Sequence, residues 1–208
     1  LLSGGLLPYP YKNHWSEVMM LEKYGSLNAV IDAHMARGEI TVLAIDGMAA
    51  SGKTTLAGML AERYGAPVVH MDDFFLRPEQ RTAARYAEPG GNFDRERFLS
   101  EVAPHLWEGH GFVYRRFDCA LMRLSESVTI PPYSMLIVEG TYSLHPVLAP
   151  FYSVRVMLAV SEDVQKSRIL KRNGEVGYRQ FAKKWIPLEN RYFSEFNVGD
   201  NADFVFNG

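Results

Sequence analysis

The chain of 208 residues lacks several features that would assign it to other classes of protein. It has one cysteine, Cys119, and therefore no internal disulfide, which fits a reducing cytoplasm. No apolar run approaches the roughly 20 residues that a membrane span needs. The formal net charge of -2 argues against nucleic acid or an anionic membrane as a partner. Without repeats or low-complexity segments, the composition predicts an ordinary cytoplasmic globular protein.

The most informative segment is residues 47–54, which read GMAASGKT and match the pattern G-x-x-x-x-G-K-[ST]. Gly47 and Gly52 allow the backbone to curl so that successive N–H groups point inward around a phosphate. Lys53 can then reach the β and γ phosphates, and the Thr54 hydroxyl can bind magnesium. The residues predicted to bind the nucleotide here are Gly47, Ala49, Ala50, Ser51, Gly52, Lys53, Thr54 and Thr55.

The flanking segments support this interpretation. Residues 40–46 are β-branched and apolar, as expected of a strand buried on both faces. Residues 54–64 follow with helical spacing of their apolar side chains, so the positive end of a helix dipole would lie at the phosphates. The alternative is a glycine-rich turn without a ligand, but such a turn has no need of Lys53 followed by Thr54.

The rest of the chain alternates between predicted strands and helices. Such alternation indicates an α/β fold with a parallel sheet and helices on both faces. Besides residues 40–46, strands are expected at 67–71, 134–139, 154–160 and 203–206. Besides 54–64, helices are expected at 15–35, from Asp94 through Leu106, at 162–172 and at 178–196. Residues 112–117 and 127–130 are expected to form a hairpin apart from the sheet, and 77–92 a long functional loop.

We expect one domain over residues 1–208, with a leading helical segment at 1–38 and the core at 39–208. The apolar residues 1–8 lack a basic lead and are broken by Pro8, so no signal peptide is predicted. The leading helix could cover the sheet or form a dimer contact, which leaves a homo-oligomer open.

Two carboxylates stand at predicted strand ends, where parallel sheets bind their ligands. Asp72 ends the strand at 67–71, and Glu139 ends the strand at 134–139. Glu139 could simply face solvent, but a carboxylate after four apolar residues is costly to bury without a cation or water nearby. Asp73 could be a turn cap or part of a metal shell.

These segments together resemble a known family. The phosphate loop, Asp72-Asp73-Phe74-Phe75, Asn92-Phe93-Asp94 and Val138-Glu139-Gly140 are similar to the uridine kinase and phosphoribulokinase family, over residues 40–206. That family includes nicotinamide riboside kinases and bacterial pantothenate kinases. The resemblance implies a P-loop NTPase three-layer sandwich with a five-stranded parallel sheet of order 2-3-1-4-5, a small hairpin and a lid near residues 168–178. It also implies Mg²⁺-ATP-dependent transfer of the γ-phosphoryl group to a hydroxyl of a small molecule.

The resemblance also implies roles for single residues. Asp72 matches the carboxylate that accepts the hydroxyl proton, Glu139 matches the metal-region glutamate, and Arg168 matches the lid arginine. Asp94 matches an aspartate that binds sugar hydroxyls, and could also cap a helix. The predicted catalytic residues are thus Asp72, Lys53 and Arg168, and the predicted metal-site residues are Thr54, Glu139 and Asp72.

The lid segment is basic. Arg168, Lys171 and Arg172 lie within about one turn of a helix and could clamp the phosphates, although cations at a helix C-terminus also interact favourably with its dipole. We assign Arg168 and Arg172 to ATP binding. Downstream, Trp185 and Leu188 are expected in the core.

The sequence departs from the family where the acceptor is chosen. Uridine kinases carry a base-reading histidine in the hairpin, whereas here Phe117-Asp118 is followed by Cys119-Ala120-Leu121. Uridine is therefore not the expected acceptor, although a nucleoside or ribosyl compound remains a reasonable one. The basic residues around the long loop and the hairpin suggest an acceptor with acidic or phosphate groups. The residues expected to bind the acceptor are Asp72, Asp94, Arg77, Tyr114 and Arg116, with Arg81, Tyr86 and Arg115 nearby.

Other functions stay open at this stage. The chain could be a P-loop ATPase or nucleotide switch that acts on a protein partner, although it lacks Asn-Lys-x-Asp and Asp-x-x-Gly motifs and a switch would not need Asp72. It could be a nucleoside monophosphate kinase, or a kinase for pantothenate or a sugar phosphate. The six histidines show no metal-ligand spacing and are expected to be structural. ATP and GTP are not distinguished.

Overall fold

The computed structural model of the chain describes residues 14–208. The apolar stretch at 1–8 and the start of the leading segment lie outside the described residues. Within the described part, no helix is both long enough and apolar enough to cross a membrane.

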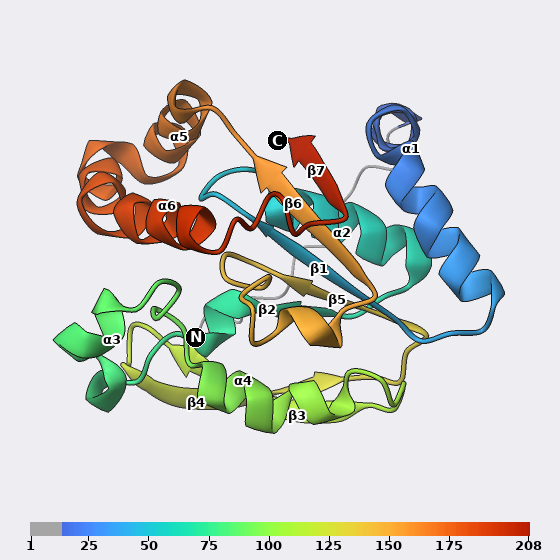
Figure 1. The fold of residues 1–208 in the computed structure, drawn as a ribbon, viewed down its shortest axis with the longest axis horizontal. Helices are drawn as coiled ribbons and strands as arrows, with labels where there is room; N and C mark the ends of the chain where they lie inside the picture. Colours follow the sequence, from blue (N-terminus) through green and yellow to red (C-terminus); the bar gives the residue numbers. More distant parts are fainter. Residues whose placement is uncertain (1–13) are drawn as a thin grey trace, which may run out of the picture.

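A five-stranded parallel sheet forms the centre of the fold (Figure 1). Its strands lie in the order β2-β5-β1-β6-β7. Counted without the two hairpin strands, this is the predicted order 2-3-1-4-5. The strands are β1 (Thr41–Gly47), β2 (Val68–His70), β5 (Met135–Glu139), β6 (Val154–Ala159) and β7 (Phe204–Asn207).

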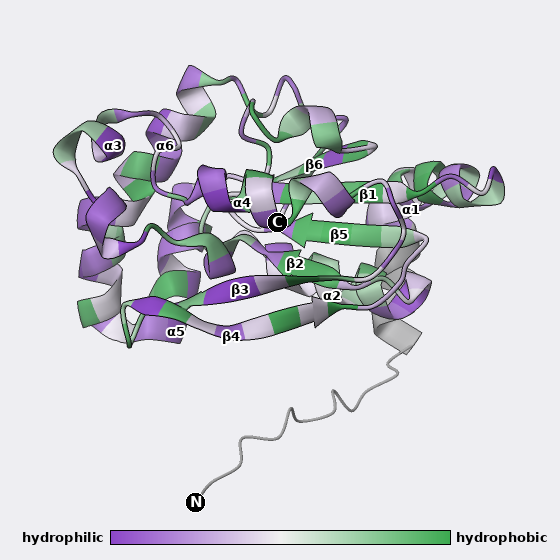
Figure 2. Ribbon diagram, turned by 90° about the horizontal axis from the view of Figure 1, so that it is seen from below, coloured by the Kyte–Doolittle hydropathy of each residue, from purple (hydrophilic) through white to green (hydrophobic). Residues whose placement is uncertain are grey.

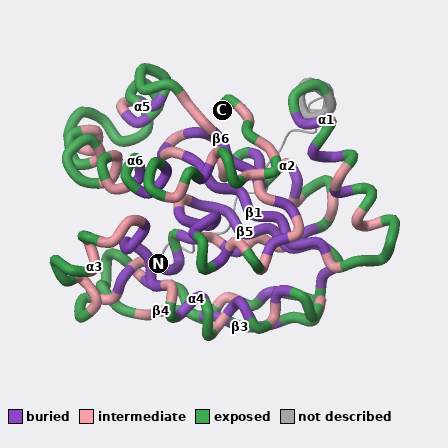
Figure 3. The backbone as a smooth tube through the Cα atoms, in the orientation of Figure 1, coloured by how far each residue is buried: buried purple, intermediate pink, exposed green. Residues whose placement is uncertain are grey.

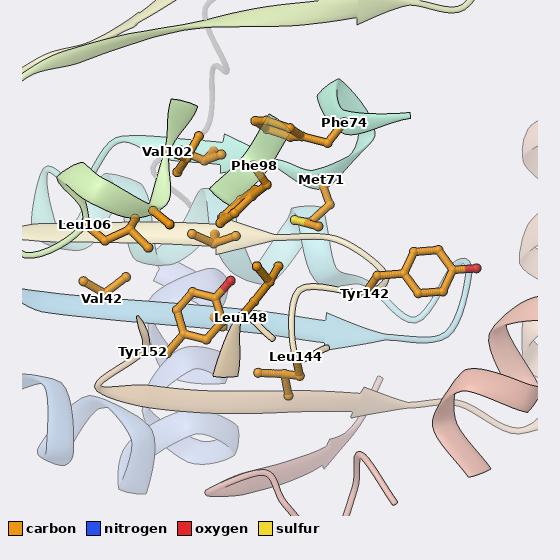
Figure 4. Close-up of a cluster of buried hydrophobic side chains, with 14 of the residues drawn as sticks. Val42, Met71, Phe74, Phe98, Val102, Leu106, Tyr142, Leu144, Leu148 and Tyr152 are labelled. Atoms are coloured by element: carbon orange, nitrogen blue, oxygen red, sulfur yellow. The ribbon is translucent and has the colours of Figure 1, made fainter. Parts of the chain in front are cut away.

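The sheet is covered on both faces, as the apolar strand sequences predict. Every residue of β1 and β5 is buried (Figure 3), and β5 is hydrophobic up to Glu139 at its end (Figure 2). Leu43 and Ile45 of β1 belong to a cluster with residues of helices α1 (His14–Ala36) and α2 (Lys53–Tyr64). Val42 and Ala44 belong to the opposite cluster, which includes the aromatic residues of the segments after β2 (Figure 4). Alternate side chains of one strand thus build two separate cores.

The second face is closed by the segment between β2 and β5. It contains α3 (Ala83–Ala87), α4 (Arg95–Glu101) and the hairpin of β3 (Phe112–Asp118) and β4 (Arg123–Ile130), which forms its own two-stranded sheet. The separate hairpin confirms the expectation from the sequence, although β4 begins four residues before the predicted 127. The predicted loop at 77–92 contains a 3₁₀ turn, Pro78–Gln80, and the short helix α3.

Two predicted helices differ from the structure. The helix that begins after Asp94 ends at Glu101 and continues as a 3₁₀ turn, Ala103–His105, because Pro104 cannot donate the next helical hydrogen bond. The predicted break between 172 and 178 is reduced to one non-helical residue, Gly174, inside α5 (Glu162–Gln180). A π-helical turn, Phe181–Trp185, then joins α5 to α6 (Ile186–Glu195).

Candidate functional site

The phosphate loop connects β1 to α2 in a conformation that its glycines permit. Gly47 has φ +149°, and a Cβ atom there would lie 2.3 Å from the carbonyl oxygen of Leu158. Gly52, with φ +101°, precedes the first residue of α2. The Lys53 ammonium group donates to the carbonyl oxygens of Gly47 at 2.8 Å and Met48 at 2.9 Å. The loop is therefore curled, with its lysine folded over it.

A cavity of about 600 Å³ opens over this loop. Its walls bring together most of the residues that the sequence assigned to nucleotide and metal, and they include side chains from α1 and the α5–α6 segment. The predicted residues that line it are Ala49, Ala50, Ser51, Gly52, Lys53, Thr54, Thr55, Asp72, Glu139, Arg168 and Arg172.

Glu139 lies beside the start of α2, as a shared metal site requires. The Thr54 hydroxyl is 3.4 Å from each carboxylate oxygen of Glu139. His70 Nδ1 is 2.6 Å from Glu139 Oε1, and this hydrogen bond raises the pKa of His70 above its ordinary value. Mg²⁺ binds one or two carboxylates together with hydroxyl and phosphate oxygens. Thr54 and Glu139 fit that chemistry. The sequence missed His70, which ends β2 and lies in register with Glu139, because the histidines show no metal-ligand spacing.

Asp72 extends into the same cavity from the 3₁₀ turn Met71–Phe74, which directly follows β2. Its side chain is reachable by solvent, but the cavity walls remove part of its hydration. This desolvation, together with the charge of Glu139, raises the pKa of Asp72, while Lys53 opposes the shift. A carboxylate that lines a substrate cavity in this way can accept a proton from a hydroxyl group of the substrate.

The α5–α6 segment holds the tip of the phosphate loop. The buried Glu189 accepts a hydrogen bond from the backbone N–H of Ala49 at 2.8 Å. Gln165 donates to the Ala49 carbonyl oxygen, and Arg168 Nη1 donates to the Ala50 carbonyl oxygen, each at 3.1 Å. The sequence placed Arg168 here but missed Glu189 and Gln165. Gln165 stands in a mainly polar stretch, and Glu189 follows three apolar residues, so neither has a local signal that singles it out.

The end of β1 is fixed by a second buried carboxylate that the sequence did not single out. Asp46 is fully buried and accepts hydrogen bonds from the N–H groups of Gly47, Tyr142 and Leu144. It also accepts one from the Tyr192 hydroxyl of α6 at 2.7 Å. Asp46 thus ties the phosphate loop, the loop after β5 and α6 to one point.

The carboxylate of Asp94 is held inside the protein by hydrogen bonds from neighbouring residues. It is fully buried, caps α4 by accepting from the Arg97 N–H at 3.2 Å, and accepts from Arg77 Nε at 3.1 Å and Gln80 Nε2 at 2.9 Å. The cap confirms the second role expected of Asp94. Arg97, which the sequence missed, also lies over the ring of Phe74 and donates to the backbone carbonyl of Asp73, so it braces the turn that carries Asp72.

The hairpin residues predicted to bind the acceptor lie against Asp73. The buried Tyr114 donates from its hydroxyl to Asp73 Oδ2 at 2.8 Å, and Arg116 Nε lies 2.8 Å from Asp73 Oδ1. Asp94, Arg77, Tyr114 and Arg116 are absent from the cavity lining. Asp72 is thus the one predicted acceptor residue that lines it.

Other side chains line the cavity together with Asp72. Phe75 and Trp185 have ring centroids 6.4 Å apart, and the buried Asn92 also lines the cavity. Trp185, expected in the core, is half-buried and faces the cavity from the end of the π-helical turn. Arg172 lies over the ring of Phe181 at 5.7 Å, at the start of that turn. In π-helical turns, which are rare, one extra residue re-aims side chains, often at functional sites.

Among residues 22–208 there is no group of three or more His, Cys, Asp or Glu side chains that could hold a metal by themselves. Any cation in this cavity would draw its remaining ligands from a bound phosphate or from water.

Solved structures that share this fold include two kinds of protein. A possible uridine kinase from Bacillus stearothermophilus is 23% identical, with a TM-score of 0.60, and the match covers 81% of this chain and 89% of that one. A protein described as a fructose transport system kinase, from Silicibacter sp. TM1040, is 22% identical, with a TM-score of 0.62 and coverage of 81% and 90%. No family model matches the chain. The likeness confirms the predicted fold, an α/β three-layer sandwich with a five-stranded parallel sheet.

Proposed function

We propose that this chain is an ATP-dependent kinase that transfers the γ-phosphoryl group to a hydroxyl group of a small molecule. The observation that carries the proposal is the position of Asp72. Its carboxylate opens into the same cavity as Lys53 and the Thr54–Glu139 pair. The two proteins that share the fold are both described as kinases, which supports the same chemistry.

The cavity residues divide the work of such a reaction. The N–H groups of the phosphate loop and Lys53 would hold the phosphates of ATP, and Thr54 and Glu139 would hold Mg²⁺, with Asp72 close to that site. The bound Mg²⁺ would offset negative charge on the phosphates. Arg168 extends from α5 to the loop at Ala50, and its guanidinium group could neutralise charge that develops during transfer.

Asp72 would accept the proton of the acceptor hydroxyl as that oxygen attacks the γ-phosphorus. The bond between the acceptor oxygen and the γ-phosphorus forms while the bond from that phosphorus to the β–γ bridging oxygen breaks, and ADP leaves. A positioned carboxylate base typically contributes 10²–10⁴-fold. A nucleotide switch would not need a base in this position, and an ATPase would use it on water without any acceptor.

For the acceptor, we propose a nucleoside or ribosyl compound. The rings of Phe75 and Trp185 offer apolar faces for a flat group, and Asn92 offers both a donor and an acceptor. A sugar phosphate or pantothenate is the alternative, and the cations available for it in the cavity are Lys53, Arg168, Arg172 and Lys23.

The test is ADP release from Mg²⁺-ATP in the presence of single acceptors. The panel contains uridine, cytidine, nicotinamide riboside, pantothenate, pentoses and pentose phosphates. We expect one acceptor to stimulate release, and Asp72→Asn to abolish that stimulation. The matched control is Asp200→Asn, which changes an exposed carboxylate in the turn after α6 and should leave the rate unchanged. ATP hydrolysis that no acceptor stimulates and that Asp72→Asn leaves intact would contradict the proposal.

A further inference from the structure

Glu189 is a buried carboxyl group that the reaction just proposed does not use. It lies in the first turn of α6 and is only 7% exposed, yet it lines the cavity. A carboxylate is unexpected in the lining of a site that receives a triphosphate, because like charges repel. Its hydrogen bond to the Ala49 N–H gives it a specific task, since that N–H belongs to the loop that surrounds the phosphates.

The backbone at this point needs support. Ala50 has φ +60°, in the left-handed region that residues with a Cβ atom rarely adopt. Such a conformation costs about 1–3 kcal/mol and persists only where the surroundings fix it. The Ala49–Ala50 segment is fixed from the α5–α6 side by Glu189 at the Ala49 N–H, by Gln165 at the Ala49 carbonyl and by Arg168 at the Ala50 carbonyl.

Of the three side chains that make these contacts, Glu189 is the one whose charge can change near neutral pH. Burial raises the pKa of Glu189 to about 7, Asp46 and Asp72 add to the increase, and Lys53 and the Ala49 N–H oppose it. The negative charge of Glu189 in turn helps to raise the pKa of Tyr142. Glu189 is therefore ionised above about pH 7 and neutral below it. In both states one of its oxygens can accept the hydrogen bond from Ala49.

We propose that Glu189 is a positioning residue for the nucleotide: through the Ala49 N–H it holds the phosphate loop in its strained, phosphate-receiving conformation, and its charge opposes the incoming triphosphate. This inference rests on the proposed function, because it assumes that a nucleoside triphosphate binds at the loop. Glu189 acts on the substrate through the loop.

The test measures binding of Mg²⁺-β,γ-imido-ATP by calorimetry at pH 6 and pH 8, without any acceptor. At pH 6, where Glu189 is neutral, Glu189→Gln should bind as the wild type does, because the amide oxygen replaces the carboxyl oxygen. Glu189→Ala should bind at least about tenfold more weakly, because a hydrogen bond that fixes the loop is lost. At pH 8, Glu189→Gln should bind more tightly than the wild type, by up to about tenfold if the bound triphosphate shifts the carboxyl pKa by about one unit.

The matched control is Glu195→Ala, which removes an exposed carboxylate from the last turn of the same helix. It should follow the wild type at both pH values. A urea midpoint for each variant shows whether it is folded. Equal affinity of Glu189→Ala and the wild type at pH 6, or no gain for Glu189→Gln at pH 8, would overturn the inference while leaving the kinase proposal intact. Failure of the wild type to bind the analogue would overturn both.

Discussion

The hydrogen bond that ties β1 to α6 can be tested by removing a single hydroxyl group. Tyr192 is fully buried and donates to Asp46 Oδ2 at 2.7 Å, whereas the buried hydroxyl of Tyr152 has no hydrogen-bond partner among the described residues. Tyr192→Phe and Tyr152→Phe therefore make the same chemical change in two environments. Both rings stay in place, so differences in packing are small.

The magnitudes follow from these partners. A hydrogen bond to a charged group is worth about 1.5–3 kcal/mol, and Asp46 keeps its three backbone donors in the variant, so Tyr192→Phe should cost about 2 kcal/mol. Tyr152→Phe should raise the free energy of unfolding by about 1 kcal/mol, since it removes a buried hydroxyl that loses its hydration without gaining a partner.

Urea unfolding followed by circular dichroism measures the difference. With a slope of about 2 kcal/mol/M, the midpoint of Tyr192→Phe should fall by roughly 1 M and that of Tyr152→Phe should rise by roughly 0.5 M relative to the wild type. Equal losses in the two variants would refute the view that Asp46 is held by the Tyr192 hydroxyl.

Further predictions concern the cavity. Lys53→Ala should abolish nucleotide turnover, as single-turnover assays would show. Asp72→Asn should keep ATP affinity within about threefold and lose at least about a hundredfold in transfer rate, and an equal loss of ATP affinity would instead assign this carboxylate to the metal. The transfer rate of the wild type should fall as the pH decreases. Because the pKa of Asp72 is raised, the midpoint of this fall should lie above the ordinary aspartate pKa of about 3.9. Gly47→Ala should remove nucleotide binding, because the added methyl group would meet a β6 carbonyl oxygen. By NMR, the pKa of His70 should lie above 6.5 and return toward it in Glu139→Gln; the pair stabilises the fold below that value, and its contribution is lost as pH rises through the raised pKa.

What the sequence predicted well depends on short stretches of chain. The strand, loop and helix around residues 41–64 follow from local periodicity and glycine chemistry, and the structure reproduces them within a residue. The strand order came from the resemblance to a family and not from periodicity, which cannot order strands by itself. The N-cap at Asp94 was predictable because a cap depends on the next few residues alone.

What the sequence missed depends on contacts between distant segments. Glu189 meets Ala49, which lies 140 residues earlier in the chain, and Tyr192 meets Asp46 across 146 residues. No local pattern announces such pairs. The same limit applies to Arg77, whose positive charge suggested a contact with the acceptor, whereas the structure pairs it with the buried Asp94.

The central position of β1 also has a consequence for how the protein is made. Thr41 pairs with Met135 of β5, and Leu43 pairs with Val154 of β6, so both neighbours of β1 are synthesised long after it. The wall against which Gly47 packs is part of β6 as well. Pairings this distant in sequence fold slowly and leave strand edges open meanwhile. A nascent chain on the ribosome should therefore stay protease-sensitive and unable to retain nucleotide until β6 has emerged, and should then become protease-resistant and able to retain nucleotide together.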